Sequence, residues 1–199
     1  MIKTILFDWG GVCCSGANQY TAPILLSHLK ISDAEIIQRV LDIETNFVEG
    51  KISKDEFWDG IIKRLNVQEI TNKEELRIHY LNSYKLYPDV LNLAKNLKEK
   101  YKVALLSNLN EEMEAHIQKN HNTQHYFNPL IFSHKEGFSK PEKKIYELAL
   151  EKLNCKPDEI VFIDDSKTNI EAAKKVGIIG ILFTNYDKLV RDLEKLKVL

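Results

Sequence analysis

Short apolar runs alternate with amphipathic stretches along most of this chain. Two of the runs, residues 103–106 and 160–163, are apolar throughout, which is typical of strands covered on both faces of a sheet. Strand and helix patterns follow one another at the spacing of βαβ units. We therefore predict an α/β fold with a doubly wound, Rossmann-like parallel sheet. The predicted strands are residues 3–7, 102–107, 130–133, 160–163 and 179–183, and the predicted helices are residues 89–100, 111–119, 142–153, 168–176 and 188–197.

The region from residue 15 to residue 87 breaks this alternation. It contains no convincing strand, but three Ser/Thr…Glu pairs at capping-box spacing each open an amphipathic run. We therefore predict a small α-helical cap at residues 15–87, inserted into an α/β core domain at residues 1–14 and 88–199. A helical module beside the first strand can exclude water and shape a substrate pocket. The capping pairs are Ser32 with Glu35, Ser53 with Glu56, and Thr71 with Glu74, and the expected small core of the cap contains Phe47, Phe57 and Trp58.

Composition and charge narrow the possible functions. The 199 residues suit one domain with a modest insertion, and a formal net charge of −1 provides no basic surface for nucleic acid or an anionic membrane. Cys13, Cys14 and Cys155 form no CxxC pair, so we expect reduced thiols. The first apolar run ends at Asp8 and is too short for a signal peptide or a membrane span. We expect a soluble, cytoplasmic protein.

The first predicted strand ends at Asp8, which is followed by Trp9, Gly10 and Gly11. In open α/β sheets, ligands bind at the carboxyl edge of the strands. A carboxylate at that edge can attack phosphorus, and the two glycines leave backbone amides open to phosphate oxygens. The alternative is an ordinary strand-end acid that caps a turn.

Two adjacent carboxylates, Asp164 and Asp165, close the strong apolar run at residues 160–163. Neighbouring carboxylates repel one another unless a cation neutralises them. Because Mg²⁺ prefers oxygen ligands, we predict a magnesium site formed by these residues and Asp8. The alternative is a solvated acidic turn that caps the next helix.

Two further segments carry groups suited to phosphate. Ser107 ends the second strong strand, and its hydroxyl with the Asn108 amide can hold a phosphoryl oxygen. Lys140 can neutralise phosphate, and Pro141 stiffens its loop and can begin the following helix. The alternatives are a turn-capping serine and an ordinary surface lysine.

These four segments, in this order, resemble the motifs of the haloacid dehalogenase (HAD) superfamily. The resemblance covers essentially the whole chain, with residues 15–87 similar to the family's small helical cap. Residues 49–57 resemble a cap feature of its sugar-phosphate phosphatase relatives. The motifs are residues 7–12, 106–108, 139–141 and 162–165, with Asn169, Ala172, Ala173 and Gly177 in the usual pattern on the following helix.

The resemblance implies a Mg²⁺-dependent phosphatase acting on a small phosphorylated metabolite, a sugar phosphate in particular, through an aspartyl-phosphate on Asp8. Dehalogenation is disfavoured because this chain keeps both acids of the fourth motif. The implied catalytic residues are Asp8 and Lys140; the phosphate-binding residues are Trp9, Gly10, Ser107, Asn108 and Lys140; and the metal ligands are Asp8, the Gly10 carbonyl, Asp164 and Asp165.

Gly10 departs from the family pattern, which places a second aspartate there as general acid and base. A backbone carbonyl ligand survives the change, but protonation of the leaving oxygen, typically worth about 10²–10⁴-fold in rate, does not. Three interpretations follow: an enzyme for good leaving groups such as acyl or anomeric phosphates, another acid or water in place of the aspartate, or a weak or inactive enzyme kept as a binding or regulatory protein.

A second alternative is a phosphonoacetaldehyde-hydrolase-like enzyme, in which Lys51 or Lys54 of the cap would form a Schiff base. Exposed lysines are common on such helices, so this interpretation is the weaker one. His116, His121 and His125 are interpreted as surface histidines rather than zinc ligands. Cys13 and Cys14 lie close to Asp8, which would make the site sensitive to oxidation.

Overall fold

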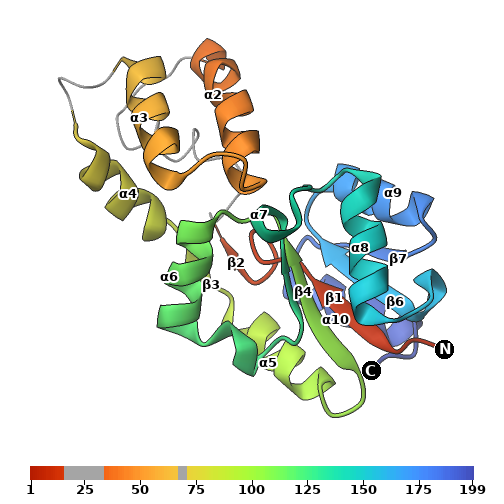
Figure 1. Cartoon of the computed structure of the whole chain (residues 1–199). Coiled ribbons are helices and arrows are strands. Elements are labelled where there is room, and N and C mark those ends of the chain that lie inside the picture. Colours follow the sequence, from red (N-terminus) through yellow and green to blue (C-terminus); the bar gives the residue numbers. More distant parts are fainter. Residues whose placement is uncertain (16–33, 67–70) are drawn as a thin grey trace.

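A parallel sheet forms the centre of the molecule (Figure 1). The computed structural model describes residues 1–15, 34–66 and 71–199. The strand order is β5-β4-β1-β6-β7, and every neighbouring pair is parallel. The predicted fold class and all five predicted strands are confirmed. The strands are β1 (Thr4–Phe7), β4 (Lys102–Ser107), β5 (Leu130–Phe132), β6 (Ile160–Asp164) and β7 (Ile179–Leu182).

Strand β1 lies in the middle of the sheet and determines where the site forms. Phe7 pairs with Leu105 of β4 on one side and with Ile163 of β6 on the other. The residues that follow these three strands therefore meet at one point of the carboxyl edge.

Helices cover both faces of the sheet. Successive residues of β1 point to opposite sides, so that Ile5 and Phe7 belong to one buried cluster and Leu6 to another. Side chains of α5, α6 and α10 complete the first cluster, and side chains of α8 and α9 complete the second. This double covering explains why the strands are apolar throughout. The helices are α5 (Pro88–Leu97), α6 (Glu111–His121), α8 (Lys143–Leu153), α9 (Lys167–Lys175) and α10 (Tyr186–Lys195), with short 3₁₀ turns η1 (Thr123–His125) and η2 (Pro157–Glu159).

In the described part of the chain, three inserted helices lie between β1 and α5 and form a separate group in Figure 1. They are α2 (Ala34–Val48), α3 (Lys54–Leu65) and α4 (Lys73–Leu81). As the helical spacing predicts, Phe47, Phe57 and Trp58 are buried and pack together, with the rings of Phe47 and Phe57 stacked at 4.2 Å. The boundaries of the cap, residues 15–87, stay a prediction.

The capping pairs have different outcomes. Ser53 and Glu56 form the expected capping box at the start of α3. The pair at Thr71 is wrong by one residue: Asn72 caps α4 by accepting a hydrogen bond from the backbone of Glu75. Asparagine is a strong capping residue, and the Thr71 hydroxyl instead donates to the Glu75 carboxylate at 2.9 Å. Ser32 lies outside the described residues.

The sequence pattern did not predict the shortest elements of the fold. An antiparallel pair, β2 (Cys14–Ser15) with β3 (Lys85–Leu86), joins the segments that lead into and out of the inserted region. Ser133, predicted as the end of a strand, instead begins the one-turn helix α7 (Ser133–Glu136). Helix α8 begins at Lys143 rather than at Pro141. In the described parts of the chain, no helix combines the length and apolarity needed to cross a bilayer.

Candidate active site

Asp8 lies where β1 ends, at the middle of the sheet edge. Its backbone N–H donates to Ile163 at 2.9 Å, which continues the sheet pairing by one residue. Its side chain is nearly buried, and its Oδ1 accepts a hydrogen bond from the backbone N–H of Trp9 at 2.7 Å. The carboxylate is therefore held by a main-chain donor and shielded from solvent.

A tight loop follows Asp8. The backbone N–H groups of Cys13 and Cys14 both donate to the Trp9 carbonyl, at 2.8 and 3.2 Å, and Gly10 forms an isolated bridge with Cys14. Gly11 has φ +76°, and a Cβ there would overlap the Asp165 carboxylate. Only glycine fits this position without strain. The sequence predicts open backbone amides at Gly10 and Gly11, but not the close approach of Gly11 to Asp165.

Lys140 connects the motifs. Its buried ammonium lies 2.8 Å from Asp8 Oδ1 and 2.7 Å from Asp164 Oδ2. The Asn108 side chain holds the lysine's main chain, accepting from the Lys140 N–H and donating to the Lys140 carbonyl, both at 2.8 Å. Asn108 therefore positions Lys140, a role that the sequence did not predict. Ser107 is buried beside Asp8 and hydrogen-bonds to its carboxylate.

Asp164 and Asp165 lie side by side in different environments. Asp164 is fully buried and accepts hydrogen bonds from the Ser166 N–H at 2.8 Å and from the Asn169 amide at 3.1 Å. Asp165 is exposed at the mouth of the site. Ser166 caps helix α9, so the helix-capping role belongs to this serine rather than to Asp165. Asn169 orients Asp164, and its only signal in the sequence was its place in the fourth motif's helix.

The buried charges shift one another's pKa values. Burial raises the pKa of Asp8 to about 7, with a further increase from Asp164 and an opposing effect from Lys140. Partial desolvation of its carboxylate, followed by the neighbouring Asp164 charge, raises the pKa of Asp165, although the residue as a whole is exposed. Burial alone would lower the pKa of Lys140, but Asp164 and Asp8 raise it above its ordinary value. The lysine therefore stays charged and holds the two carboxylates together.

The arrangement has the donor set of a divalent cation site. Single carboxylate oxygens of Asp8, Asp164 and Asp165 lie within 4.8 Å of one another. Three carboxylates face one ammonium, which leaves excess negative charge at the edge. Oxygen ligands of this kind suit Mg²⁺ rather than a thiophilic metal.

Trp9, Cys13 and Cys14 follow Asp8 in the chain, and their side chains are buried. The Trp9 indole is fully buried, and in the described part of the chain its Nε1 has no hydrogen-bond partner. Trp9 therefore faces Asp8 with its main-chain N–H only. Cys13 and Cys14 form no disulfide with the described residues, both are buried, and burial raises the pKa of Cys13. This environment disfavours oxidation.

The lysines and histidines considered in the sequence do not form alternative centres. Lys51 and Lys54 are exposed, and an ion pair with Glu49 at 2.5 Å raises the pKa of Lys51. A Schiff-base lysine needs the opposite shift. Among the described residues, the histidines of α6 and η1 contribute to no group of three metal ligands.

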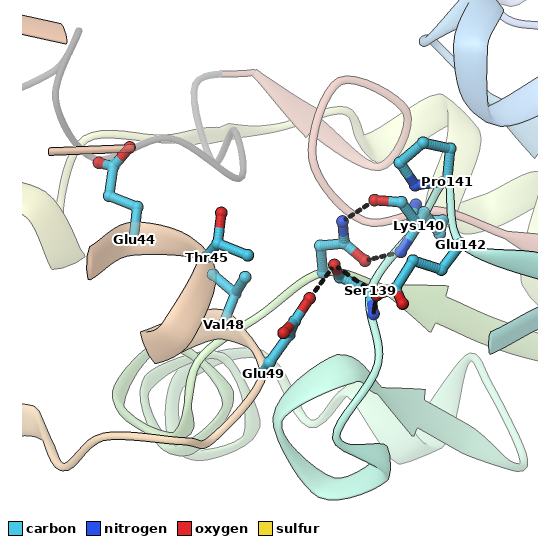
Figure 2. A pocket seen from close by; sticks show the side chains of 9 residues that line it. Glu44, Thr45, Val48, Glu49, Ser139, Lys140, Pro141 and Glu142 are labelled. Carbon is cyan, nitrogen blue, oxygen red and sulfur yellow. Dashed lines mark hydrogen bonds between the residues drawn. The ribbon is translucent and has the colours of Figure 1, made fainter. Parts of the chain in front are cut away.

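A pocket of about 370 Å³ adjoins Lys140 and lies between helix α2 and the loop that carries this lysine (Figure 2). Its two walls are joined by a hydrogen bond from the Ser139 hydroxyl to Glu49 Oε1 at 2.6 Å. The sequence did not predict that these segments, which lie far apart in the chain, form a pocket together. The lining consists of Glu44, Thr45, Val48, Glu49, Asn108, Ser139, Lys140, Pro141 and Glu142.

Comparison with known proteins identifies the family. The sequence model of the haloacid dehalogenase-like hydrolases matches residues 2–177. The chain belongs to the haloacid dehalogenase-like hydrolase family. This HAD hydrolase is 42% identical over 70 residues to mouse bifunctional epoxide hydrolase 2, a match covering 35% of this chain and only 13% of that protein. It is 27% identical to D-ribitol-5-phosphate phosphatase of Bacteroides thetaiotaomicron, over 89% of each chain.

A solved structure supports the same assignment. A HAD family enzyme from Bacteroides thetaiotaomicron, crystallised with magnesium and inorganic phosphate, matches with a TM-score of 0.79. The two chains are 25% identical, and the match covers 95% of this HAD hydrolase and 99% of that chain.

Proposed function

We propose that this HAD hydrolase is a Mg²⁺-dependent phosphatase that hydrolyses a small phosphomonoester, a sugar phosphate in particular, through an aspartyl-phosphate on Asp8. The observation that carries the proposal is the buried contact of Lys140 with both Asp8 and Asp164 at the sheet edge. The relatives named as phosphatases and the magnesium and phosphate complex of the similar enzyme support it.

In the proposed reaction, the Asp8 carboxylate attacks phosphorus, and the ester P–O bond breaks with its electron pair leaving on the alcohol oxygen. Lys140, the Ser107 hydroxyl and the Trp9 N–H neutralise or donate to the transferring group. Water then attacks phosphorus, restores the Asp8 carboxylate and releases inorganic phosphate. Asn108 acts indirectly, by holding the main chain of Lys140.

Mg²⁺, held by Asp8, Asp164, Asp165 and the Gly10 carbonyl, would supply positive charge next to the phosphoryl group. The inserted helices would act as a cap that limits water access, and the protein is proposed to act in the cytoplasm. Gly10 offers no side chain to protonate the departing oxygen, so solvent supplies that proton and substrates with good leaving groups are favoured.

The first test is hydrolysis of p-nitrophenyl phosphate with Mg²⁺, with EDTA and with the Asp8→Asn variant. We expect turnover that requires Mg²⁺ and falls by about 10⁴-fold or more in the variant, because an amide cannot act as the nucleophile. Asp187→Asn, an exposed aspartate in the first turn of α10, is the matched control. Near-normal turnover by Asp8→Asn would rule out the covalent mechanism.

Gly10 favours a second candidate, a non-catalytic binding protein that kept the fold. A binder would be stabilised by phosphate and Mg²⁺ without turnover. Turnover of p-nitrophenyl phosphate separates the two, and the variant Gly10→Asp tests whether the missing acid limits the enzyme. For an enzyme that lacks only the acid, it should raise kcat on alkyl phosphates by about 10–100-fold and leave p-nitrophenyl phosphate little changed. No gain on alkyl phosphates would mean that another group already donates the proton.

A further inference from the structure

The pocket beside Lys140 has a defined chemical character. It adjoins the proposed phosphate site, because its lining includes Lys140 and Asn108. Its opposite wall is the carboxyl-terminal part of helix α2, which Figure 2 shows facing the loop of residues 139–142. A phosphomonoester bound at Asp8 would extend its leaving group into this space.

The charges that line the pocket are unbalanced. Lys140 is the cation of the lining, and its ammonium is held by Asp8 and Asp164. The other charged side chains of the lining are carboxylates: Glu44, Glu49 and Glu142. The leaving group would therefore meet anions on both walls.

Hydrogen bonds to Ser139 hold two of these carboxylates in place. Glu49 accepts from the Ser139 hydroxyl at 2.6 Å, and Glu142 Oε1 accepts from the Ser139 N–H at 3.1 Å. Lys51 pairs with Glu49, but its side chain is 56% exposed and is not part of the pocket lining. Hydrogen bonds to Ser139 and the ion pair with Lys51 lower the pKa of Glu49, although burial opposes them. Glu49 is therefore ionised at neutral pH.

We propose that Glu44, Glu49 and Glu142 select phosphomonoesters whose leaving group is uncharged or cationic and donates hydrogen bonds, against those that carry a carboxylate or a second phosphate. Ionised carboxylates only accept hydrogen bonds, which suits hydroxyl and ammonium groups. A second anion on the substrate would be repelled by these side chains and would lose hydration without gaining a donor. This inference rests on the proposed phosphatase function and names its substrate class.

Three phosphomonoesters of equal length test the proposal: 2-hydroxyethyl phosphate, O-phosphoethanolamine and phosphoglycolate. They differ only in a terminal hydroxyl, ammonium or carboxylate. We expect kcat/KM for the first two to exceed that for phosphoglycolate by about tenfold or more, mostly through KM. Equal values, or a preference for phosphoglycolate, would overturn the inference.

The variant Glu142→Gln tests the wall directly, because glutamine keeps an oxygen that can accept from the Ser139 N–H while removing the charge. It should lower KM for phosphoglycolate severalfold and thereby reduce the ratio of kcat/KM for 2-hydroxyethyl phosphate to kcat/KM for phosphoglycolate. Glu44→Gln provides an independent second variant. Glu147→Gln, on α8 and outside the pocket lining, is the matched control and should not change the ratio.

Hydrolysis of p-nitrophenyl phosphate under the same conditions distinguishes failure of the proposed phosphatase activity from failure of the proposed substrate selectivity. Its absence would overturn the proposed function and this inference with it. Its presence, together with an unchanged substrate ratio in Glu142→Gln and Glu44→Gln, would overturn the inference alone.

Discussion

The sheet edge and the pocket wall lie next to each other but are built on different principles. At the edge, Asp8, Lys140 and Asp164 are buried and hold one another through ion pairs of 2.7–2.8 Å. On the wall, Glu142 is exposed and Glu49 contacts the core through Ser139. The difference indicates that rigid strands place the reacting groups, while an inserted helix and a loop choose what reaches them.

The inserted helices also contact the core away from the pocket, through Glu112 of α6. Glu112 of α6 accepts from the Trp58 indole at 2.6 Å and from Arg77 Nε at 2.8 Å, so it holds both α3 and α4. Helix α2 packs against α3, so the position of its pocket residues depends in part on the contact between Glu112 and α3. Variants at Lys140, Gly11 and Glu112 should show whether the sheet edge and the pocket wall affect different properties of the protein.

The largest effect is expected for Lys140→Met. Removing the ammonium leaves Asp8 and Asp164 buried together, which should lower the free energy of unfolding by about 3–5 kcal/mol without metal. Mg²⁺ can replace part of the missing charge, so it should raise Tm more in the variant than in the wild type. Urea and thermal unfolding with and without Mg²⁺ measure both quantities.

Lys144→Met, four residues further along the chain and exposed on α8, is the control for loss of a lysine. If Lys140→Met unfolds like the wild type in EDTA, the ion pairs do not hold the edge together.

A smaller effect is expected for Gly11→Ala. The added Cβ would overlap the Asp165 carboxylate, and the positive φ adds about 1–2 kcal/mol of backbone strain. We expect Asp165 to be displaced and the Mg²⁺ concentration for half-maximal activity to rise about tenfold. Titration of activity against Mg²⁺ measures this shift.

Gly137→Ala is the matched control, because Gly137 has φ +75° but open space around its Cβ position. It should reproduce the strain without changing the Mg²⁺ requirement. A similar shift in both variants would show that backbone strain, rather than the contact with Asp165, is responsible.

The smallest effect is expected for Glu112→Gln, which keeps an acceptor but weakens the contacts with Trp58 and Arg77. We expect a loss of about 0.5–1.5 kcal/mol in unfolding free energy and a rise in KM with kcat little changed. The neighbouring exposed residue provides the control variant Glu111→Gln. A fall in kcat alone would contradict the separation between the edge and the wall.

The sequence predicted the elements with strong periodic signals and missed those without. The long apolar runs of β4 and β6 were placed within one residue, because burial on both faces imposes an uninterrupted apolar pattern. The two-residue strands β2 and β3 and the single turn α7 are too short to show any period. At Thr71 the capping signal was real but shifted, since Asn72 competes for the same role.

For the site, local sequence indicated the residue types at three strand ends, Asp8, Ser107, Asp164 and Asp165, and in the loop after α7, Lys140. These positions follow from chain order alone, because parallel strands bring their carboxyl ends to one edge. Folding decided that Lys140 pairs with two carboxylates at once, that Asn108 binds the lysine's main chain and that Gly11 touches Asp165. Such contacts join residues distant in sequence, so no hydrophobic periodicity in the sequence indicates them. The acidic pocket wall depends still more on tertiary structure, because it forms only where α2 meets the loop at residues 139–142.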